Sequence, residues 1–500
     1  MKKYIIFSIL LCFFASNVSS QSSAKYFRYW ELDYQFHSYR TRNQLDALNY
    51  KFTDCYQVSY DNSGRFERVL FLKRGKPANN QNGFCEIRFK YLPGIEKRIV
   101  YNQKGVITTS SDGASTYVYT LNDKNFRTSL MNYDIKGNLM EDNGGCARYD
   151  WKLDDKGRKI SENYWNLKGE QISKKNGIYE TRYKWSKDDK DFNEESYWDK
   201  NGLLIKIPGS ASIFLRRYDK NGNNVEGRNL DDKYHLMETK NGDAVYKIKY
   251  DTIENLGIEY RYFGIDEKLK ELKQGFAGVT IKYDKSGNAV KQCYLGINWK
   301  LKEIDGIAYV KMEYDNWGYI SKYSYFGSDR LLKENLKSGI SFITYKYDEQ
   351  GNKTEVKNFG KNEKLKENLL EGFAIGRYKY DGQGNVTEFK YFGIDEKLKE
   401  STIHKFAICR IKYDYIGNKI ESSNFGVDGK LRGDSNRIAI VRWNYDNQGN
   451  IIEECHYGVD QLLLNTKKET AKIRFKYDER GQLLSTTYLN SNEEILFTTN

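Results

Sequence analysis

Apolar and polar residues alternate in short stretches that return along the chain at a regular interval. Between residues 407 and 413, apolar side chains occupy every second position and end in Tyr413, while Arg410 and Lys412 lie between them. The stretches 439–445 and 471–477 repeat this alternation. A period of two is typical of a β-strand. We therefore predict strands with one apolar face and with a second face that becomes basic towards its end.

A turn motif follows each of these strands. Tyr-Asp-x-x-Gly occurs at steps of 32 or 33 residues, beginning at Tyr314, Tyr347, Tyr380, Tyr413, Tyr445 and Tyr477. Weaker copies extend the frame back to Tyr60, which makes about fourteen turns with a period of about 32 residues, and such a period indicates an array of one supersecondary unit. The turn chemistry is local, because Asp suits the first position of a type I turn and Gly the fourth. The best-defined structural turns are Asp348 with Gly351, Asp381 with Gly384, Asp414 with Gly417 and Asp446 with Gly449.

A second turn lies about thirteen residues after the first, at pairs such as Phe392-Gly393 and Phe425-Gly426. Each unit therefore consists of strand, turn, strand and turn. We predict an all-β protein of tandem antiparallel β-hairpins. Because strongly twisted sheets rarely exceed about 10 strands without curling or splitting, the array must form a coiled ribbon or a superhelical, shell-like body. The tyrosines of the Tyr-Asp turns should form an aromatic ladder.

Small residues recur at a fixed level of the repeat. Ala407 lies six residues before its Tyr, and Gly372 lies eight residues before Tyr380. Small side chains at one level predict close approach of neighbouring strands, and Gly permits a bend there.

The register of each hairpin depends on how the turn closes. If Asp closes against Gly, Arg410 lies opposite Glu421 and Arg442 opposite Glu453. A three-residue loop with a bulge would shift every pair by one. Charge pairing favours the first register.

The ends of the chain differ from the array. Residues 1–20 are typical of a secretory signal, with Lys2 and Lys3 before an apolar run and Val18-Ser19-Ser20 before the expected cleavage point. We predict an exported protein that is periplasmic, cell-surface or secreted, with no transmembrane helix after the signal. We expect an irregular cap in residues 21–49, the array in 50–490 and a C-terminal tail in 491–500.

Charge and cysteine content restrict the function classes. The 81 Lys and Arg exceed the 68 Asp and Glu, which could suit an anionic polymer, a membrane surface or the cell envelope. Nucleic acid is not expected, because the basic residues alternate with Glu instead of forming a stripe. Cys55 and Cys85 occupy nearly the same level one repeat apart, so they are either buried thiols or a disulfide pair.

No catalytic motif is recognisable. The four histidines are scattered, and no H-E-x-x-H, P-loop or G-x-S-x-G sequence occurs. We predict a non-enzymatic protein without a metal or cofactor. The candidates for binding are Trp151, Trp165, Trp185 and Trp198, which could stack on sugar rings or on a protein partner, or could simply pack in the array.

The turn core resembles the YD-repeat, or RHS, family of exported bacterial β-repeat proteins. Tyr-Asp-x-x-Gly-Asn begins at Tyr133, Tyr218, Tyr283, Tyr347, Tyr380, Tyr413 and Tyr445. The resemblance covers most of the chain after residue 20 and implies an antiparallel ribbon that in some members encloses cargo. WG and MORN-like hairpin repeats are a looser likeness. The leading hypothesis is an extended binding surface for a protein, glycan or envelope partner; the alternatives are an RHS-like shell for toxin delivery and an enzyme without a recognisable motif.

Overall fold

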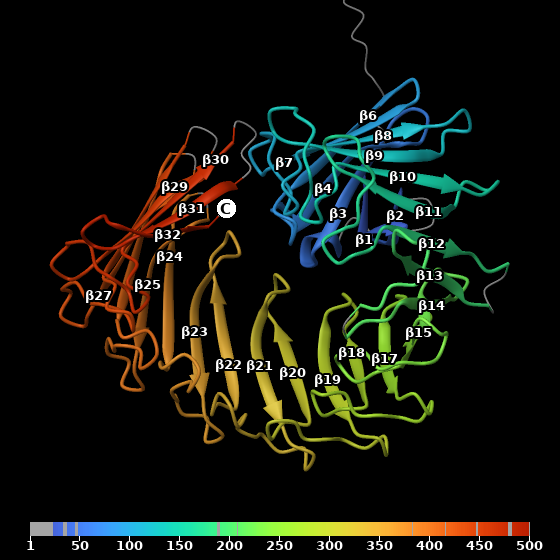
Figure 1. The fold of residues 1–500 in the computed structure, drawn as a ribbon. Helices are drawn as coiled ribbons and strands as arrows, with labels where there is room; N and C mark the ends of the chain where they lie inside the picture. The colour runs from blue at the N-terminus through green and yellow to red at the C-terminus, as the bar shows by residue number, and fades with distance from the viewer. Residues whose placement is uncertain are drawn as a thin grey trace, which may run out of the picture.

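The computed structural model places every strand in a single antiparallel sheet of 32 strands. It describes residues 24–33, 38–45, 49–187, 191–207, 209–382, 384–415, 417–446, 449–478 and 483–499. The sheet bends round on itself as an open coil (Figure 1). The predicted all-β array of hairpins in a coiled ribbon is confirmed. The predicted signal segment lies outside the described residues.

Each repeat contributes two strands, and the first of them ends at the Tyr-Asp-type turn. The first strands are β3 (Cys55–Tyr60), β6 (Glu86–Leu92), β8 (Thr116–Leu121), β10 (Arg148–Leu153), β12 (Glu180–Lys184), β14 (Ile213–Tyr218), β16 (Val245–Tyr250), β18 (Gly278–Tyr283), β20 (Tyr309–Tyr314), β22 (Phe342–Tyr347), β24 (Ile375–Tyr380), β26 (Ile408–Tyr413), β28 (Ile440–Tyr445) and β30 (Lys472–Tyr477). The second strands are β4 (Phe66–Lys73), β7 (Ile95–Tyr101), β9 (Arg127–Tyr133), β11 (Lys159–Trp165), β13 (Asn193–Trp198), β15 (Asn224–Leu230), β17 (Gly257–Phe263), β19 (Ala289–Leu295), β21 (Ile320–Phe326), β23 (Lys353–Phe359), β25 (Val386–Phe392), β27 (Lys419–Phe425), β29 (Ile451–Tyr457) and β31 (Leu483–Leu489).

The remaining elements lie at the two ends. They are β1 (Lys25–Asp33), β2 (Ser38–Leu45), the 3-10 turn η1 (Asn49–Phe52), the short β5 (Lys76–Pro77) and β32 (Ile495–Thr499). Two boundaries differ from the prediction. The segment expected to be an irregular cap contains the regular hairpin β1–β2, and part of the expected tail is strand β32, which pairs with β31. In both places an extra strand covers the backbone edge that a terminal hairpin would otherwise leave open.

The small-residue column is buried along the sheet. Ala407 is completely buried. Its N–H donates to the carbonyl of Phe425 at 2.8 Å, and its carbonyl accepts from the N–H of Tyr391 at 2.9 Å. Ala407 therefore joins the second strands of two successive units, with no space for a larger side chain.

The Tyr-Asp turn closes as a three-residue loop between Asp and Asn. The N–H of Asp414 donates to the carbonyl of Asn418 at 2.9 Å, and Gly417 has a φ of +105°. The carboxylate of Asp414 accepts from the backbone and side-chain amides of Asn418 at 2.8 and 2.9 Å. The turns of Asp348, Asp381 and Asp446 repeat these bonds with Asn352, Asn385 and Asn450.

Both predicted registers are wrong for the strands beyond this turn. A further bulge lies between Lys412 and Tyr413, so that Arg410 is opposite Ser423 and Lys412 is opposite Glu421. The loop adds one residue and the bulge adds another, and the pairing is displaced by two from the favoured register. The physical reason is that hydrogen bonds between the Asp and Asn side chains stabilise the longer loop. This stabilisation is larger than that from a single exposed ion pair.

In the last four units, the arginine of the first strand instead contacts the glutamate of the preceding unit. Arg410 lies opposite Glu388, and their charged groups are 3.1 Å apart. Arg377 pairs in the same way with Glu355, and Arg442 with Glu421, each at 2.9 Å. These ion pairs therefore join neighbouring hairpins rather than the two strands of one hairpin.

A double-mutant cycle distinguishes the two arrangements. Arg410 and Glu388 should show a coupling free energy of about 0.2–1 kcal/mol, as is usual for cross-strand ion pairs. Arg410 and Glu421 serve as the control and should show no coupling. Coupling to Glu421 but not to Glu388, measured by denaturant unfolding, would contradict the observed register.

The tyrosines of the turns connect successive units through hydrogen bonds. Each hydroxyl donates to the carbonyl of the first residue in the preceding unit's second strand, next to the bulge that interrupts the ladder. At 2.7–3.2 Å these bonds run from Tyr91 to Phe66, Tyr250 to Asn224, Tyr283 to Gly257, Tyr314 to Ala289, Tyr347 to Ile320, Tyr380 to Lys353, Tyr413 to Val386, Tyr445 to Lys419 and Tyr477 to Ile451. Successive tyrosines of the expected ladder are thus linked to the neighbouring unit by a hydrogen bond from each hydroxyl to a backbone carbonyl.

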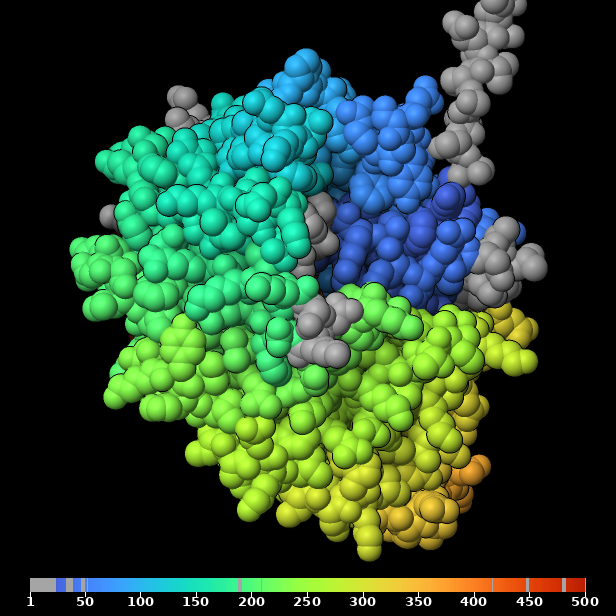
Figure 2. Space-filling model, turned by 90° about the vertical axis from the view of Figure 1, so that its right-hand side faces the viewer, coloured from blue at the N-terminus to red at the C-terminus, as the bar shows by residue number. Residues whose placement is uncertain are grey.

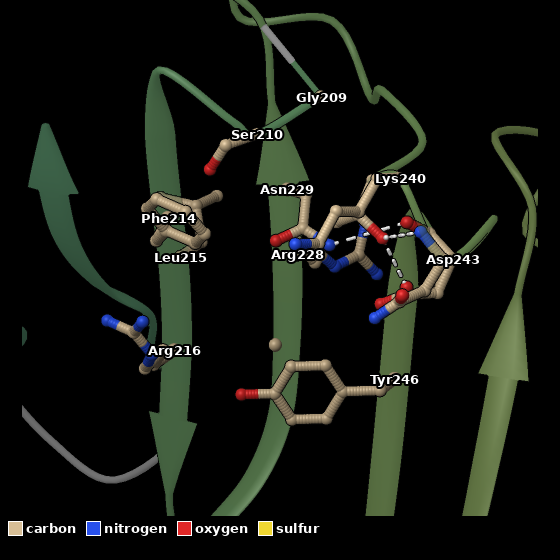
Figure 3. A pocket seen from close by; sticks show the side chains of 13 residues that line it. Gly209, Ser210, Phe214, Leu215, Arg216, Arg228, Asn229, Lys240, Asp243 and Tyr246 are labelled. Atoms are coloured by element: carbon tan, nitrogen blue, oxygen red, sulfur yellow. Dashed lines mark hydrogen bonds between the residues drawn. The ribbon is translucent and has the colours of Figure 1, made fainter. Parts of the chain in front are cut away.

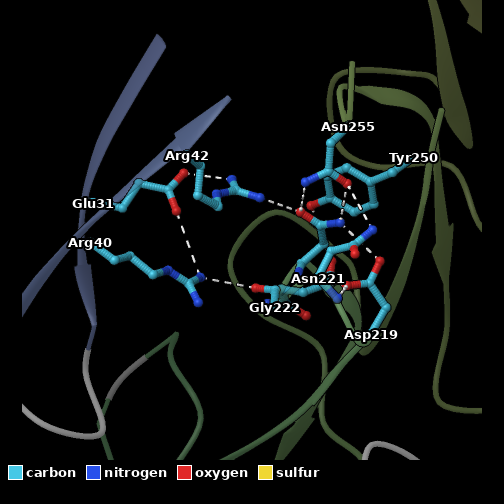
Figure 4. A network of polar contacts seen from close by, with 10 residues as sticks. Glu31, Arg40, Arg42, Asp219, Asn221, Gly222, Tyr250 and Asn255 are labelled. Atoms are coloured by element: carbon cyan, nitrogen blue, oxygen red, sulfur yellow. Dashed lines mark hydrogen bonds and ion pairs between the residues drawn. The ribbon is translucent and has the colours of Figure 1, made fainter. Parts of the chain in front are cut away.

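The N-terminal strands rest against a rim made of Tyr-Asp turns from distant units. Arg40 donates to the carbonyl of Gly222 at 3.0 Å, and Arg42 contacts the side chain of Asn223 (Figure 4). Further contacts join Arg28 to the carbonyl of Ser286, Asn43 to that of Glu254 and Lys76 to that of Glu349. Figure 2 shows the N-terminal strands lying directly against the units near residues 250–300. These contacts hold the curvature of the coil.

A buried ionic cluster lies beside the N-terminal hairpin. Glu96 and Arg98 are each only 2% exposed, with their charged groups 2.7 Å apart. Arg127 binds the other oxygen of Glu96, and Arg98 donates to the hydroxyl of Tyr119 at 3.0 Å. Burial alone would raise the pKa of Glu96, but Arg98 and Arg127 outweigh it and hold that pKa below its usual value.

Candidate functional site: a hollow on the aromatic face

One face of the sheet carries tyrosines such as Tyr260 and Tyr262 of β17 and is called here the aromatic face. This face has a hollow at strands β14–β16. In the next unit, Tyr260 and Tyr262 of β17 cover this level of the face; their equivalents in β15 are Gly227 and Asn229. Two large rings are therefore missing. The resulting hollow has a volume of about 380 Å³ (Figure 3).

Tyr246 partly covers the space that Gly227 leaves. Tyr246 lies opposite Gly227 on the neighbouring strand. Its ring occupies the space that a Cβ atom on Gly227 would need. The Tyr246 hydroxyl accepts from the side-chain amide of Asn224 at 2.6 Å. Phe214 lines the hollow as a second aromatic ring.

Charged and polar groups surround these rings. Arg216 is opposite Gly227, and its guanidinium pairs with Glu195 at 2.7 Å. Burial lowers the pKa of Arg216, but the Glu195 carboxylate outweighs it, so the pKa is raised and the group stays charged. Across the hollow, the hydroxyl of Thr239 donates to Asp243 at 2.5 Å. Loops before β14 and before β16 close the upper side with Ser210 and Lys240.

This arrangement has the features of a binding site. Aromatic rings beside a few oriented polar groups are typical of ligand sites. The hydrogen bond from the Thr239 hydroxyl orients the Asp243 carboxylate at the side of the hollow. Within the described ranges, no group of three or more His, Cys, Asp or Glu side chains could hold a metal ion.

The four candidate tryptophans lie in the neighbouring units but not in the hollow. Trp151 is 5% exposed and donates to Glu162 at 2.8 Å, so it has no face to offer a ligand. Trp165 and Trp198 are half-buried, each beneath an arginine, Arg148 or Arg182, at 4.5 and 4.0 Å.

The fourth tryptophan also packs within the sheet. Trp185 stacks on Tyr183 at 5.7 Å, and its indole N–H donates to the carbonyl of Lys159. For Trp151 the burial contradicts a binding role. The other three tryptophans have their ring faces against their own chain.

The two cysteines that could have formed a disulfide are free thiols in this structure. Cys55 and Cys85 lie in one apolar cluster with Leu70 and Leu72. Burial raises the pKa of Cys55 to about 12 and that of Cys85 to about 11. Both thiols are therefore protonated near neutral pH and act as small apolar side chains.

Sequence reasoning missed the hollow. A signal was present, because Gly227 and Asn229 interrupt columns that carry Tyr260 and Tyr262 one unit later. These columns can be seen only when the sequences of the second strands of successive units are aligned with each other. The sequence shows the absence of the rings but not that Tyr246 lies across Gly227.

Comparisons with known proteins give weak similarities. No protein-family profile matches the chain, and no curated protein does. A crystal structure of TcdB2-TccC3-TEV shares 10% identity with a TM-score of 0.34, covering 88% of this chain and 26% of that one. A Tc holotoxin pore from Photorhabdus luminescens shares 12% identity with a TM-score of 0.30, covering 91% and 26%. This chain thus spans about a quarter of their length, and the similarities are too weak to carry an argument about function.

Proposed function

We propose that this protein is a non-enzymatic β-repeat scaffold that binds a partner on its aromatic face, with the hollow at Gly227 as the point of attachment. The observation that supports the proposal is the hollow left where two rings of the next unit have no counterpart, at a place where Phe214, Tyr246 and Asp243 converge. Rings and hydrogen-bonding groups of this kind suit a sugar residue or a polar side chain. We include export in the proposal, with residues 1–20 as the signal.

Filling the hollow tests this function. Asn229→Tyr places in β15 the residue that β17 carries at Tyr262, so the sheet should accept it. We expect ligands that the purified protein captures on a neutral glycan array to bind the variant at least about tenfold more weakly, a loss of about 1.4 kcal/mol.

The matched control is Asn424→Tyr. Asn424 occupies the equivalent position in β27, and both asparagines donate to a backbone carbonyl in the following loop, at 3.3 and 3.5 Å. This control should retain binding. Equal binding by both variants, or no captured glycan at all, would contradict a glycan site in the hollow.

A shell-like role related to toxin delivery is the second candidate. The observation that favours it is the contact of the N-terminal strands with the turns at residues 222, 254, 286 and 349, which holds the ribbon in a coil. Proteins named in the Tc toxin structures are among those similar to this chain. Protection of a bound polypeptide from protease by the intact coil would favour the shell over the open scaffold.

No helix in the described part of the chain is both long enough and apolar enough to cross a membrane.

A further inference from the structure

The charged face of the sheet carries a column of glutamates that two consecutive units interrupt. The third residue of the second strand is glutamate in most units of the later array, namely Glu226, Glu259, Glu355, Glu388, Glu421 and Glu453. In β19 and β21 the same position holds Lys291 and Lys322. A negative column thus becomes positive over the strands β18–β21.

The register brings like charges together at this interruption. Lys291 lies directly opposite Lys282 of β18 on one side and Lys311 of β20 on the other. Like charges directly opposite each other destabilise a sheet. By contrast, Glu388 forms ion pairs with Lys379 at 3.5 Å and with Arg410 at 3.1 Å. In the described part of the chain, Lys282, Lys291, Lys311 and Lys322 form no ion pair with a carboxylate, although Glu313 lies opposite Lys322.

Aromatic rings hold three of these lysines in place. The ammonium group of Lys291 lies 4.1 Å from the ring centre of Tyr309, that of Lys311 5.1 Å from Phe326, and that of Lys322 4.4 Å from Phe342. These cation–π contacts order the long side chains. Lys282, Lys291 and Lys311 therefore form one row across β18–β20, on strands that lie about 4.8 Å apart. Lys322 of β21 lies two residues along from this row, opposite Glu313.

We propose that this lysine row binds an acidic polysaccharide, with Lys282, Lys291 and Lys311 contacting successive carboxylate or sulfate groups and Lys322 adding positive charge beside them. The spacing of strands is similar to the length of one sugar in an extended chain. Thr280 and Thr344 lie on the same face and are half-buried, so their hydroxyls can bond to sugars. These positions offer no apolar side chain to enter a bilayer, which disfavours a membrane as the partner. This site is on the opposite face from the hollow and does not depend on it.

Restoring the glutamate pattern tests the proposal. The purified full-length chain should bind polygalacturonate at moderate ionic strength, and neutral dextran should not bind. The double variant Lys291→Glu, Lys322→Glu should lose at least about tenfold in affinity. The new carboxylate at position 291 faces Lys282 and Lys311, whereas the one at position 322 faces Glu313 and Thr344. Because one gain in charge pairing offsets one loss, the thermal midpoint should change little.

A control variant with the same change in charge is Lys379→Glu, Lys412→Glu, on the same face but in units that keep their glutamate. It should retain most of the affinity for polygalacturonate. An equal loss in both variants would reduce the binding to net charge and overturn the site. Stronger binding to phosphatidylserine vesicles or to duplex DNA than to polygalacturonate would overturn the assignment of the partner. None of these results depends on the Asn229→Tyr experiment.

Discussion

Replacing Glu96 by Gln should lower the local stability of strands β6–β9 by about 3–5 kcal/mol, because it leaves Arg98 charged and buried without its counterion. Glu96 and Arg98 are each 2% exposed, so water cannot replace the lost contact. Native-state hydrogen exchange of the β7 and β8 amides measures the effect, since each unit of a repeat array opens largely with its neighbours.

The same residue predicts a pH dependence. Arg98 and Arg127 hold the pKa of Glu96 below its usual value in the folded state. The stability from this carboxylate is therefore fully present above the unfolded pKa of about 4.3 and is lost as the pH falls through the lower folded pKa. The difference between the wild type and Glu96→Gln should shrink in acid, because protonated Glu96 is also neutral.

Glu267→Gln is the surface control for this experiment. Glu267 pairs with Arg228 at 2.9 Å but is half exposed. Its substitution should cost less than about 1 kcal/mol. If Glu96→Gln were no more damaging than Glu267→Gln, the buried cluster would not contribute as the geometry indicates.

Replacing Ala407 by Leu should destabilise strands β25–β27 by about 1–3 kcal/mol, because a completely buried methyl position cannot accept three more carbons without moving the backbone. The backbone on both sides is held by hydrogen bonds from Ala407 to Phe425 and from Tyr391 to Ala407. Hydrogen exchange of the Tyr391 and Ala407 amides would report the loss directly.

Lys412→Leu is the matched control, since it places the same side chain on the exposed face of the same strand. Its cost should stay below about 1 kcal/mol, which is the usual value of an exposed ion pair such as that of Lys412 with Glu421. Equal stability of the Ala407→Leu protein and the wild type would show that the column is not tightly packed.

The sequence by itself determined the hairpins, their number and the buried small column. Alternation with a period of two specifies a strand, and Asp-x-x-Gly specifies a turn, through contacts within a few residues. Local chemistry of this kind can be read from residues such as Asp414, Gly417 and Ala407. The all-β coil follows, because so many twisted strands cannot remain flat.

Only the tertiary structure decided the register, the curvature of the coil and the hollow. The register depends on a bulge beside Tyr413, where the hydroxyl of Tyr445 in the next unit donates to the carbonyl of Lys419. The curvature depends on Arg40 meeting Gly222, 182 residues away along the chain. The hollow depends on Tyr246 crossing Gly227 of the neighbouring strand. Each of these features joins side chains across different units, where neither periodicity nor turn chemistry specifies which atoms will meet.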